Sequence, residues 1–170
     1  MSHLEHKNQP VDCLRIMVIT ISDTRDYSTD KSGAIMMDLL KGENFELVEY
    51  RIIKDDQKEI ETTLLQACYH PDIDAILMNG GTGLSVRDVT YEVMDKLIEK
   101  PIPGYGELFR MLSYEEIGSA AMLSRATAGI VNGTVIFSTP GSTGAVKLAM
   151  KKLILPELRH IVGEIRKNLG

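Results

Sequence analysis

Patterns typical of buried strands alternate with patterns typical of helices along the first half of the chain. Residues 14–21 form a mostly apolar and β-branched run, as in a strand covered on both faces of a parallel sheet. Apolar residues recur at helical spacing within residues 35–40, and Gly42 is expected to end that helix. A second strand is predicted over residues 45–53, and a second helix over residues 59–69.

The second half continues this alternation with more glycine and proline. A third strand is predicted over residues 74–78 and a helix over residues 88–99. Residues 100–106 contain two prolines and two glycines, so we predict a loop there. Two shorter helices are expected over residues 107–112 and 119–124.

The Asn132-Gly133 dipeptide lies between two short apolar runs, residues 129–131 and 134–137, and predicts a hairpin. A loop then leads into a helix that ends near residue 154. Pro156 is expected to begin the last helix, because proline suits the first helical turn.

The repeated order of strand, helix and strand predicts one α/β domain with a mostly parallel sheet. The chain has 170 residues, of which 44% are hydrophobic, enough for a single well-packed core. We expect this domain to cover residues 13–170, after a flexible polar arm of residues 1–12.

The charge balance narrows the range of ligands. With 19 basic and 24 acidic side chains the chain has a formal net charge of −5, which disfavours binding to nucleic acid. Aromatic residues make up only 5%, so stacking platforms for single strands are scarce. Cys13 and Cys68 show neither metal-ligand nor disulfide spacing, and we expect a cytoplasmic protein without signal peptide or membrane span.

Three glycines in four positions follow the third predicted strand, namely Gly80, Gly81 and Gly83, with Thr82 between them. Glycines let backbone N–H groups approach an anion closely, and the N-terminus of the next helix adds partial positive charge. The segment is neither a Walker A loop nor a dinucleotide fingerprint. It fits either a phosphate-binding loop or a tight strand-to-helix turn without a ligand.

A second loop of this kind, with Pro140, Gly141 and Ser142, joins the last buried strand to a helix. The plainer interpretation is that Ser142 or Thr143 caps that helix. Ligands of parallel sheets bind at the carboxyl ends of the strands. Two such loops at neighbouring strand ends therefore favour an extended polyanionic ligand.

Carboxylates also gather at the predicted strand ends. Asp55 and Asp56 follow the second strand, and Asp88 follows the glycine loop. Taken singly, the first two fit a solvated turn and Asp88 fits a helix cap. Beside two anion-binding loops, they predict Mg²⁺ held between carboxylate and phosphate oxygens.

Two further features offer donors to a phosphate. After the first strand, Ser22, Asp23 and Arg25 bring a hydroxyl, a carboxylate and a guanidinium, with an Asp-rich surface turn as the alternative. Lys147, in the helix after the second loop, fits either a phosphate contact or a solvated helix face. The residues alone thus predict an α/β domain that binds a phosphorylated ligand together with Mg²⁺.

Several motifs of the chain resemble, in the same order, those of the MoaB/Mog family of molybdenum cofactor biosynthesis proteins, which includes the G domain of gephyrin. They are TISDTR at 20–25, NGGTG at 79–83 with RDVT at 87–90, PGYGELFR at 103–110, LSRA at 123–126 and PGSTGAV at 140–146. The resemblance covers about residues 13–168. It implies a three-layer αβα sandwich that assembles as trimers, or as hexamers of two trimers, and contacts with other molybdenum cofactor biosynthesis proteins.

The resemblance also implies molybdopterin adenylyltransferase activity, in which ATP and molybdopterin give adenylyl-molybdopterin and pyrophosphate with Mg²⁺. The acidic positions linked to catalysis fall on Asp55 (with Asp56 as the neighbouring alternative) and on Asp88, which are also the implied Mg²⁺ ligands. Glu107 and Arg125 are implied as pocket or subunit-interface residues. The implied substrate-binding residues are Ser22, Asp23, Gly80, Gly81, Thr82, Gly83, Pro140, Gly141 and Ser142.

Two other functions stay open at the level of sequence. One is a member of the same fold that holds molybdopterin as a binding protein or scaffold without adenylylating it. The other is a nucleotide-binding regulator. Nucleotide binding without affinity for the pterin would indicate this function.

Overall fold

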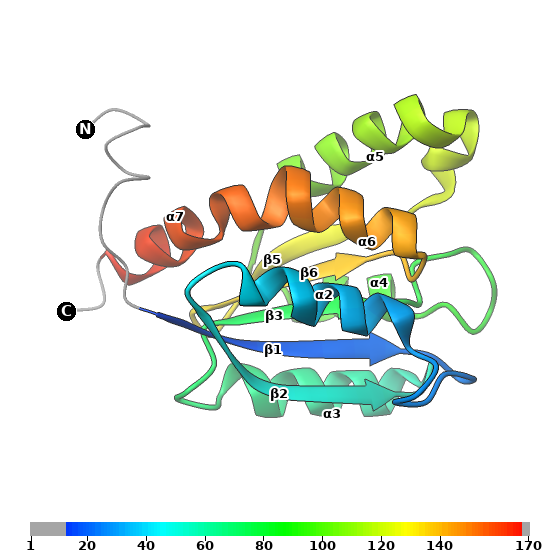
Figure 1. Ribbon diagram of the computed structural model, residues 1–170. Helices are drawn as coiled ribbons and strands as arrows, with labels where there is room; N and C mark the ends of the chain where they lie inside the picture. Colours follow the sequence, from blue (N-terminus) through cyan, green and yellow to red (C-terminus); the bar gives the residue numbers. More distant parts are fainter. Residues whose placement is uncertain (1–12, 168–170) are drawn as a thin grey trace.

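The computed structural model describes residues 13–167, and the expected N-terminal arm, residues 1–12, lies outside them. The strands of its sheet are β1 (Leu14–Ile21), β2 (Phe45–Ile53), β3 (Ala75–Asn79), β4 (Lys100–Pro101), β5 (Thr127–Val131) and β6 (Thr134–Thr139). They form one six-stranded sheet in the order β2-β1-β3-β6-β5-β4 (Figure 1). Strands β2, β1, β3 and β6 are parallel, whereas β5 and β4 run antiparallel to their neighbours.

Helices cover both faces of this sheet. They are α2 (Lys31–Lys41), α3 (Gln57–Cys68), α4 (Thr90–Leu97), α5 (Pro103–Ile117), the 3-10 helix η1 (Gly118–Leu123), α6 (Thr143–Ala149), the π-helical turn η2 (Met150–Ile154) and α7 (Leu155–Arg166). Helices α2, α5, α6 and α7 pack on one face, and α3 and α4 on the other (Figure 1). This confirms the predicted αβα sandwich with a mostly parallel sheet. None of the helices within residues 13–167 is long and apolar enough to cross a membrane.

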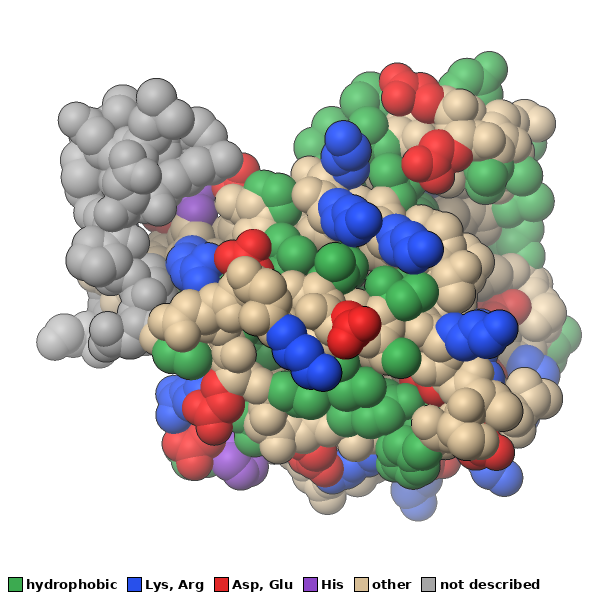
Figure 2. Space-filling model, in the orientation of Figure 1, with side chains coloured by type: hydrophobic (Ala, Val, Ile, Leu, Met, Phe, Trp, Pro, Cys, Tyr) green, Lys and Arg blue, Asp and Glu red, His purple; other side chains and the backbone are tan. Residues whose placement is uncertain are grey.

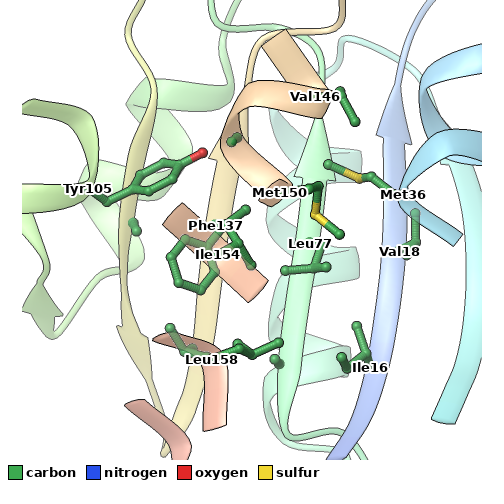
Figure 3. Packing of buried hydrophobic residues seen from close by; sticks show 14 of the residues in the cluster. Ile16, Val18, Met36, Leu77, Tyr105, Phe137, Val146, Met150, Ile154 and Leu158 are labelled. Atoms are coloured by element: carbon green, nitrogen blue, oxygen red, sulfur yellow. The ribbon is translucent and has the colours of Figure 1, made fainter. Parts of the chain in front are cut away.

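The alternation of side chains along the central strands divides the core into two halves. Ile16 and Val18 of β1 pack with Leu77 of β3 under helices α2, α6 and α7, as Figure 3 shows. Met17 and Ile19 of β1 face α3 and α4 instead. Because both faces of β1 are covered, its sequence is a nearly continuous apolar run rather than an alternating one.

The prediction of a loop over residues 100–106 was wrong. This segment contains β4 and the beginning of α5, which starts at Pro103 and continues through the short helix expected over residues 107–112. Pro103 suits the first turn of a helix, where its missing N–H is not needed. A Cβ on Gly106 would stand 2.6 Å from the carbonyl oxygen of Ala126, so close packing explains the glycine inside the helix.

Smaller differences concern the ends of helices. Helix α4 begins at Thr90 rather than at Asp88. The helix after the second loop continues through η2 into α7, so Pro156 lies in the first turn of α7 but does not follow a loop. These boundaries depend on local hydrogen bonds, which the apolar pattern of a sequence does not encode.

Candidate functional site

A cavity of about 380 Å³ lies at the carboxyl ends of the four parallel strands, at the right-hand edge of the sheet in Figure 1. This is where ligands bind in open parallel sheets. It brings together most of the residues predicted from the sequence, from four separate loops. The lining residues are Ile21, Ser22, Asp23, Thr24, Arg25, Asp55, Gly80, Gly81, Thr82, Gly83, Asp88 and Gly141.

Two predicted residues of the second loop lie outside this lining. Pro140 precedes the lining residue Gly141, and Ser142 is the N-cap of α6, where its hydroxyl accepts a hydrogen bond of 3.2 Å from a backbone N–H. The plainer interpretation of Ser142 as a helix cap is therefore confirmed. Lys147 on α6 and Glu107 on α5 are exposed and also lie outside the lining.

Left-handed backbone at Gly80 (φ 104°) and Gly81 (φ 70°) shapes the loop after β3. A side chain on Gly80 would collide with the carbonyl oxygen of Ile21, so this position needs glycine for its conformation and for its close approach. Thr90, the first residue of α4, donates from its hydroxyl to the carbonyl of Gly80 (3.1 Å) and from its N–H to that of Gly81 (3.2 Å). The start of α4 thus fixes the loop.

The carbonyl and amide groups of this loop are used differently. The next two carbonyl oxygens, of Thr82 and Gly83, accept hydrogen bonds from Arg125, the first from its backbone N–H at 3.1 Å and the second from its guanidinium at 2.8 and 3.1 Å. Within residues 13–167, no protein acceptor takes the N–H groups of Gly81, Thr82 and Gly83. The loop therefore offers three successive backbone donors to an anion in the cavity.

Of the two adjacent carboxylates after β2, only Asp55 lines the cavity. Its Oδ1 lies 3.1 Å from the point where a Cβ on Gly81 would stand, so the glycine loop packs directly against it. Asp56 is instead the N-cap of α3 and accepts a hydrogen bond of 2.9 Å from the N–H of Glu59. The geometry thus places Asp55 in the cavity and Asp56 on the helix.

Asp88 lies against the other end of the glycine loop. Its Oδ2 is 2.8 Å from the point where a Cβ on Gly83 would stand. The carboxylate accepts hydrogen bonds from the N–H and the hydroxyl of Ser85, at 3.1 and 2.7 Å. Asp88 does not cap α4, whose N-cap is Val89, so the helix-cap interpretation of Asp88 was wrong.

An ion pair joins the loop after β1 to the loop after β3. Two guanidinium nitrogens of Arg87 donate to the two carboxylate oxygens of Asp23, each at 3.0 Å. Asp23 also accepts a hydrogen bond of 3.1 Å from the N–H of Asp55. The hydrogen bond from Arg87 holds the pKa of Asp23 below its ordinary value, so this carboxylate stays ionised.

Negative charge is concentrated around Asp55. Burial raises the pKa of Asp55, and the charges of Asp23 and Asp88 raise it further, while Arg87 opposes them. A bound cation would relieve this repulsion. Within the described part of the chain, no three acidic, His or Cys side chains form a ready-made metal site. Mg²⁺ nevertheless commonly takes one or two carboxylates and completes its shell with phosphate oxygens and water, and Asp55 with Asp88 fits that donor set.

Arg125 fixes the loop after β3 through several hydrogen bonds. Besides its bonds to Thr82 and Gly83, the guanidinium donates to the carbonyl oxygen of Asp88 at 2.9 Å. It also pairs with Glu92 and lies 5.3 Å from the ring centroid of Tyr91. Arg125 therefore ties both ends of the loop that carries Asp88. The family resemblance implies Arg125 only as a pocket or subunit-interface residue, and these contacts could not be predicted because the main partners are backbone carbonyls.

These features define a class of protein, an α/β domain with a glycine-rich anion loop and paired carboxylates at the carboxyl edge of a parallel sheet. Comparison with known proteins narrows the class. The family described as "Probable molybdopterin binding domain" matches residues 17–160. Molybdenum cofactor biosynthesis protein B of Bacillus subtilis is 53% identical over 169 residues, which cover 99% of each chain.

Solved structures agree with this result. A crystal structure of molybdenum cofactor biosynthesis protein B has a TM-score of 0.90 at 50% identity, covering 94% of this chain and 100% of that one. The tungsten cofactor synthesizing protein MoaB from Pyrococcus furiosus has a TM-score of 0.83 at 38% identity, covering 92% and 99%. The chain therefore belongs to the molybdopterin-binding MoaB/Mog family of molybdenum cofactor biosynthesis proteins, as its motifs predicted.

Proposed function

We propose that this protein binds molybdopterin and MgATP in the cavity and transfers AMP to molybdopterin, releasing pyrophosphate. The observation that carries the proposal is the loop after β3. Its carbonyls are bound by Thr90 and Arg125, while the N–H groups of residues 81–83 have no acceptor within residues 13–167. Fixed donors of this kind suit the phosphate oxygens of a nucleotide. Membership of the family supports molybdopterin as the second substrate.

Asp55 and Asp88 are the residues that would hold Mg²⁺. Both line the cavity, and both lie against glycines of the donor loop, so a phosphate on that loop is within reach of a metal on these carboxylates. When bound, Mg²⁺ supplies charge neutralisation for the triphosphate. This would reconcile an acidic cavity with a highly anionic substrate.

The transfer requires little proton chemistry from the protein. An oxygen of the molybdopterin phosphate forms a bond to the α-phosphorus of ATP, and the bond from that phosphorus to the bridging oxygen breaks. The electron pair leaves with pyrophosphate. A phosphate monoester is already largely ionised near neutral pH, so no side chain has to act as a base. The contribution of the protein is positioning and charge stabilisation, with Ser22 and Asp23 as candidate contacts for the pterin.

The test combines purified protein, molybdopterin and MgATP and measures pyrophosphate and adenylyl-molybdopterin. We expect equal amounts of the two products from the wild-type protein. Asp88→Ala is expected to lose turnover by about 100-fold or more, without change in the circular dichroism spectrum. Normal turnover by this variant would overturn the assignment of Asp88. Molybdopterin binding without turnover in the wild type would indicate a protein that only binds molybdopterin. Nucleotide binding without affinity for the pterin would indicate a nucleotide-binding regulator.

We also propose that the protomers assemble through α5 and η1 into a trimer, or into a hexamer of two trimers. Figure 2 shows hydrophobic side chains gathered at the upper right of the molecule, over α5. Exposed apolar surface of this extent is typical of association sites. Six large apolar side chains of these two elements are between 47% and 76% exposed, namely Leu108, Met111, Tyr114, Ile117, Met122 and Leu123.

We further propose that the protein works in the cytoplasm. Both cysteines are unpaired, Cys13 at the surface and Cys68 in the core, as is usual in a reducing compartment. Burial raises the pKa of the Cys68 thiol to about 12, with a smaller contribution from the charge of Glu99. Cys68 is therefore a packing residue rather than a reactive thiol.

A further inference from the structure

We propose that Arg25 makes the β6 side of the cavity an anion-binding end, which holds a phosphate group of the ligand apart from the carboxylates. The identity of that ligand rests on the proposed function, whereas the anion site itself does not. Within residues 13–167, Arg25 is the only Lys or Arg that lines the cavity, beside three carboxylates. Its charge is thus the main attraction that a side chain offers there to an anion.

Long-range contacts hold Arg25 in place. The Nη2 atom donates to the carbonyl oxygen of Gly141 at 2.9 Å, and Nη1 lies 3.5 Å from Oδ1 of Asn79. The backbone N–H of Arg25 donates to the hydroxyl of Ser22 at 3.0 Å, which closes the turn after β1. Although Arg25 follows β1, its guanidinium therefore reaches past the end of β3 to the end of β6.

These contacts use only part of the donor capacity of Arg25. A guanidinium carries five N–H groups. One donates to Gly141 and one to Asn79, and no acceptor in the described part of the chain takes the other three. The side chain is 32% exposed. A planar fork with free donors at the wall of a cavity matches the oxygens of a phosphate group.

A buried carboxylate orients this guanidinium without consuming its donors. Oδ1 of Asp30 lies 3.8 Å from Nη1 of Arg25, beyond hydrogen-bond distance. Asp30 instead accepts hydrogen bonds from the hydroxyls of Thr20 (2.6 Å) and Tyr50 and caps α2. Thr20 in turn accepts a hydrogen bond of 2.9 Å from the side-chain amide of Asn79. This network turns the amide oxygen of Asn79 toward Arg25, so the position of the guanidinium is set before a ligand arrives.

Charge is therefore unevenly distributed along the cavity. The order of the sheet puts Asp55, which follows β2, on one side and Gly141, which follows β6 and binds Arg25, on the other. Asp23 and Asp88 follow β1 and β3, which lie between them. One phosphate group would meet the carboxylates through a cation, and a second would meet Arg25 directly. Because molybdopterin and ATP both carry phosphate, either is a possible source of the second group.

The first experiment uses inorganic pyrophosphate as the probe, in metal-free buffer, with isothermal titration calorimetry on the full-length protein. Loss of a charge-assisted contact predicts that Arg25→Gln weakens binding by about tenfold or more. Arg25→Lys keeps the charge without the fork and is expected to lose less. The matched control is Arg51→Gln, since Arg51 pairs with Glu49 on β2 and lies outside the cavity lining. A thermal unfolding curve for each variant checks the fold.

The second experiment repeats the titration with molybdopterin and with MgATP. If Arg25→Gln loses affinity tenfold for only one of these two ligands, the result supports the proposal and identifies the ligand whose phosphate Arg25 holds. Wild-type affinity of Arg25→Gln for all three probes would overturn the proposal. It would also be overturned if affinity fell in Arg87→Gln but not in Arg25→Gln, since Arg87 pairs with Asp23 outside the cavity lining. If Arg25→Gln does not fold, Arg25→Met replaces it, because methionine keeps the apolar stem and removes the charge, and wild-type affinity in Arg25→Met would overturn the proposal. Since pyrophosphate binding needs no turnover, failure of adenylyl transfer would leave this result intact.

Discussion

Asp55 and Asp56 are adjacent in the chain, but their carboxylates serve different parts of the molecule. Asp55 lines the cavity beside Gly81, and burial together with the charges of Asp23 and Asp88 raises its pKa. Asp56 caps α3 through the N–H of Glu59. One carboxylate thus stands where its charge is disfavoured, and the other where it stabilises a helix.

This division predicts opposite effects of substitution. Asp55→Asn is expected to lower adenylyl transfer by about 100-fold or more while leaving stability equal or higher, because the folded state disfavours the charge of Asp55. Asp56→Ala is expected to keep activity and to lose roughly 0.5–2 kcal/mol of unfolding free energy, the usual cost of a lost N-cap. Urea unfolding and the pyrophosphate assay on both variants give the comparison. Full activity in Asp55→Asn together with loss in Asp56→Ala would reverse the assignment.

The sequence predicted the central strands closely because β1 and β3 are covered on both faces, which leaves uninterrupted apolar runs. It also predicted that Asp55 and Asp88 would meet, because parallel topology alone brings the carboxyl ends of strands to one edge. The beginning of α5 was missed because Gly106 is set by its contact with Ala126, a residue distant in sequence. Arg125 was implied as a pocket or subunit-interface residue, but its fixing of the loop that carries Asp88 was missed, since backbone carbonyls carry no residue-specific signal.

Arg125 provides a second prediction, because it binds both ends of the loop that carries Asp88. Arg125→Gln removes the hydrogen bonds to the carbonyls of Gly83 and Asp88. We expect amide hydrogen exchange in residues 83–88 to become several-fold faster and turnover to fall about tenfold, with α4 unchanged.

The control for this prediction is Glu92→Gln, which breaks only the ion pair with Arg125. Half-exposed ion pairs of this kind contribute roughly 0–1 kcal/mol, so exchange and turnover should stay near the wild-type values. Equal effects of the two variants would show that the ion pair, rather than the carbonyl contacts, holds the loop.

Asp74, at the amino end of β3, leads to a prediction about pH. Burial alone would raise the pKa of Asp74, but hydrogen bonds from Arg15 and Arg166 outweigh it and hold this pKa below its ordinary value. The stability that Asp74 contributes is therefore complete above the unfolded carboxyl pKa of about 3.9, and it is lost as pH falls through the lower folded-state pKa.

Asp74→Asn should accordingly be less stable than the wild type by roughly 1–3 kcal/mol at neutral pH. The difference should shrink as the pH falls below about 4, where the wild-type carboxylate also becomes protonated. Urea unfolding of both proteins at pH 7 and at pH 3 measures this difference in unfolding free energy. A difference that stays constant between the two values would mean that packing of the side chain, and not its charge, is responsible.

The exposed apolar surface of α5 and η1 leads to the last prediction. Met111 is 54% exposed on α5, and a charge there would be desolvated if protomers meet at this surface. A trimer of an 18.9 kDa chain has a mass of about 57 kDa, and Met111→Asp is expected to reduce the mass seen by light scattering toward that of the protomer. Tyr69→Asp is the matched control, because Tyr69 is 66% exposed at the end of α3, on the other face of the sheet. Tyr69→Asp should keep the wild-type mass, because Tyr69 lies away from α5 and η1. A general loss of solubility or fold would instead affect both variants alike. A wild-type mass of 18.9 kDa would refute the assembly itself, whereas an unchanged mass in Met111→Asp would place the contact on another surface.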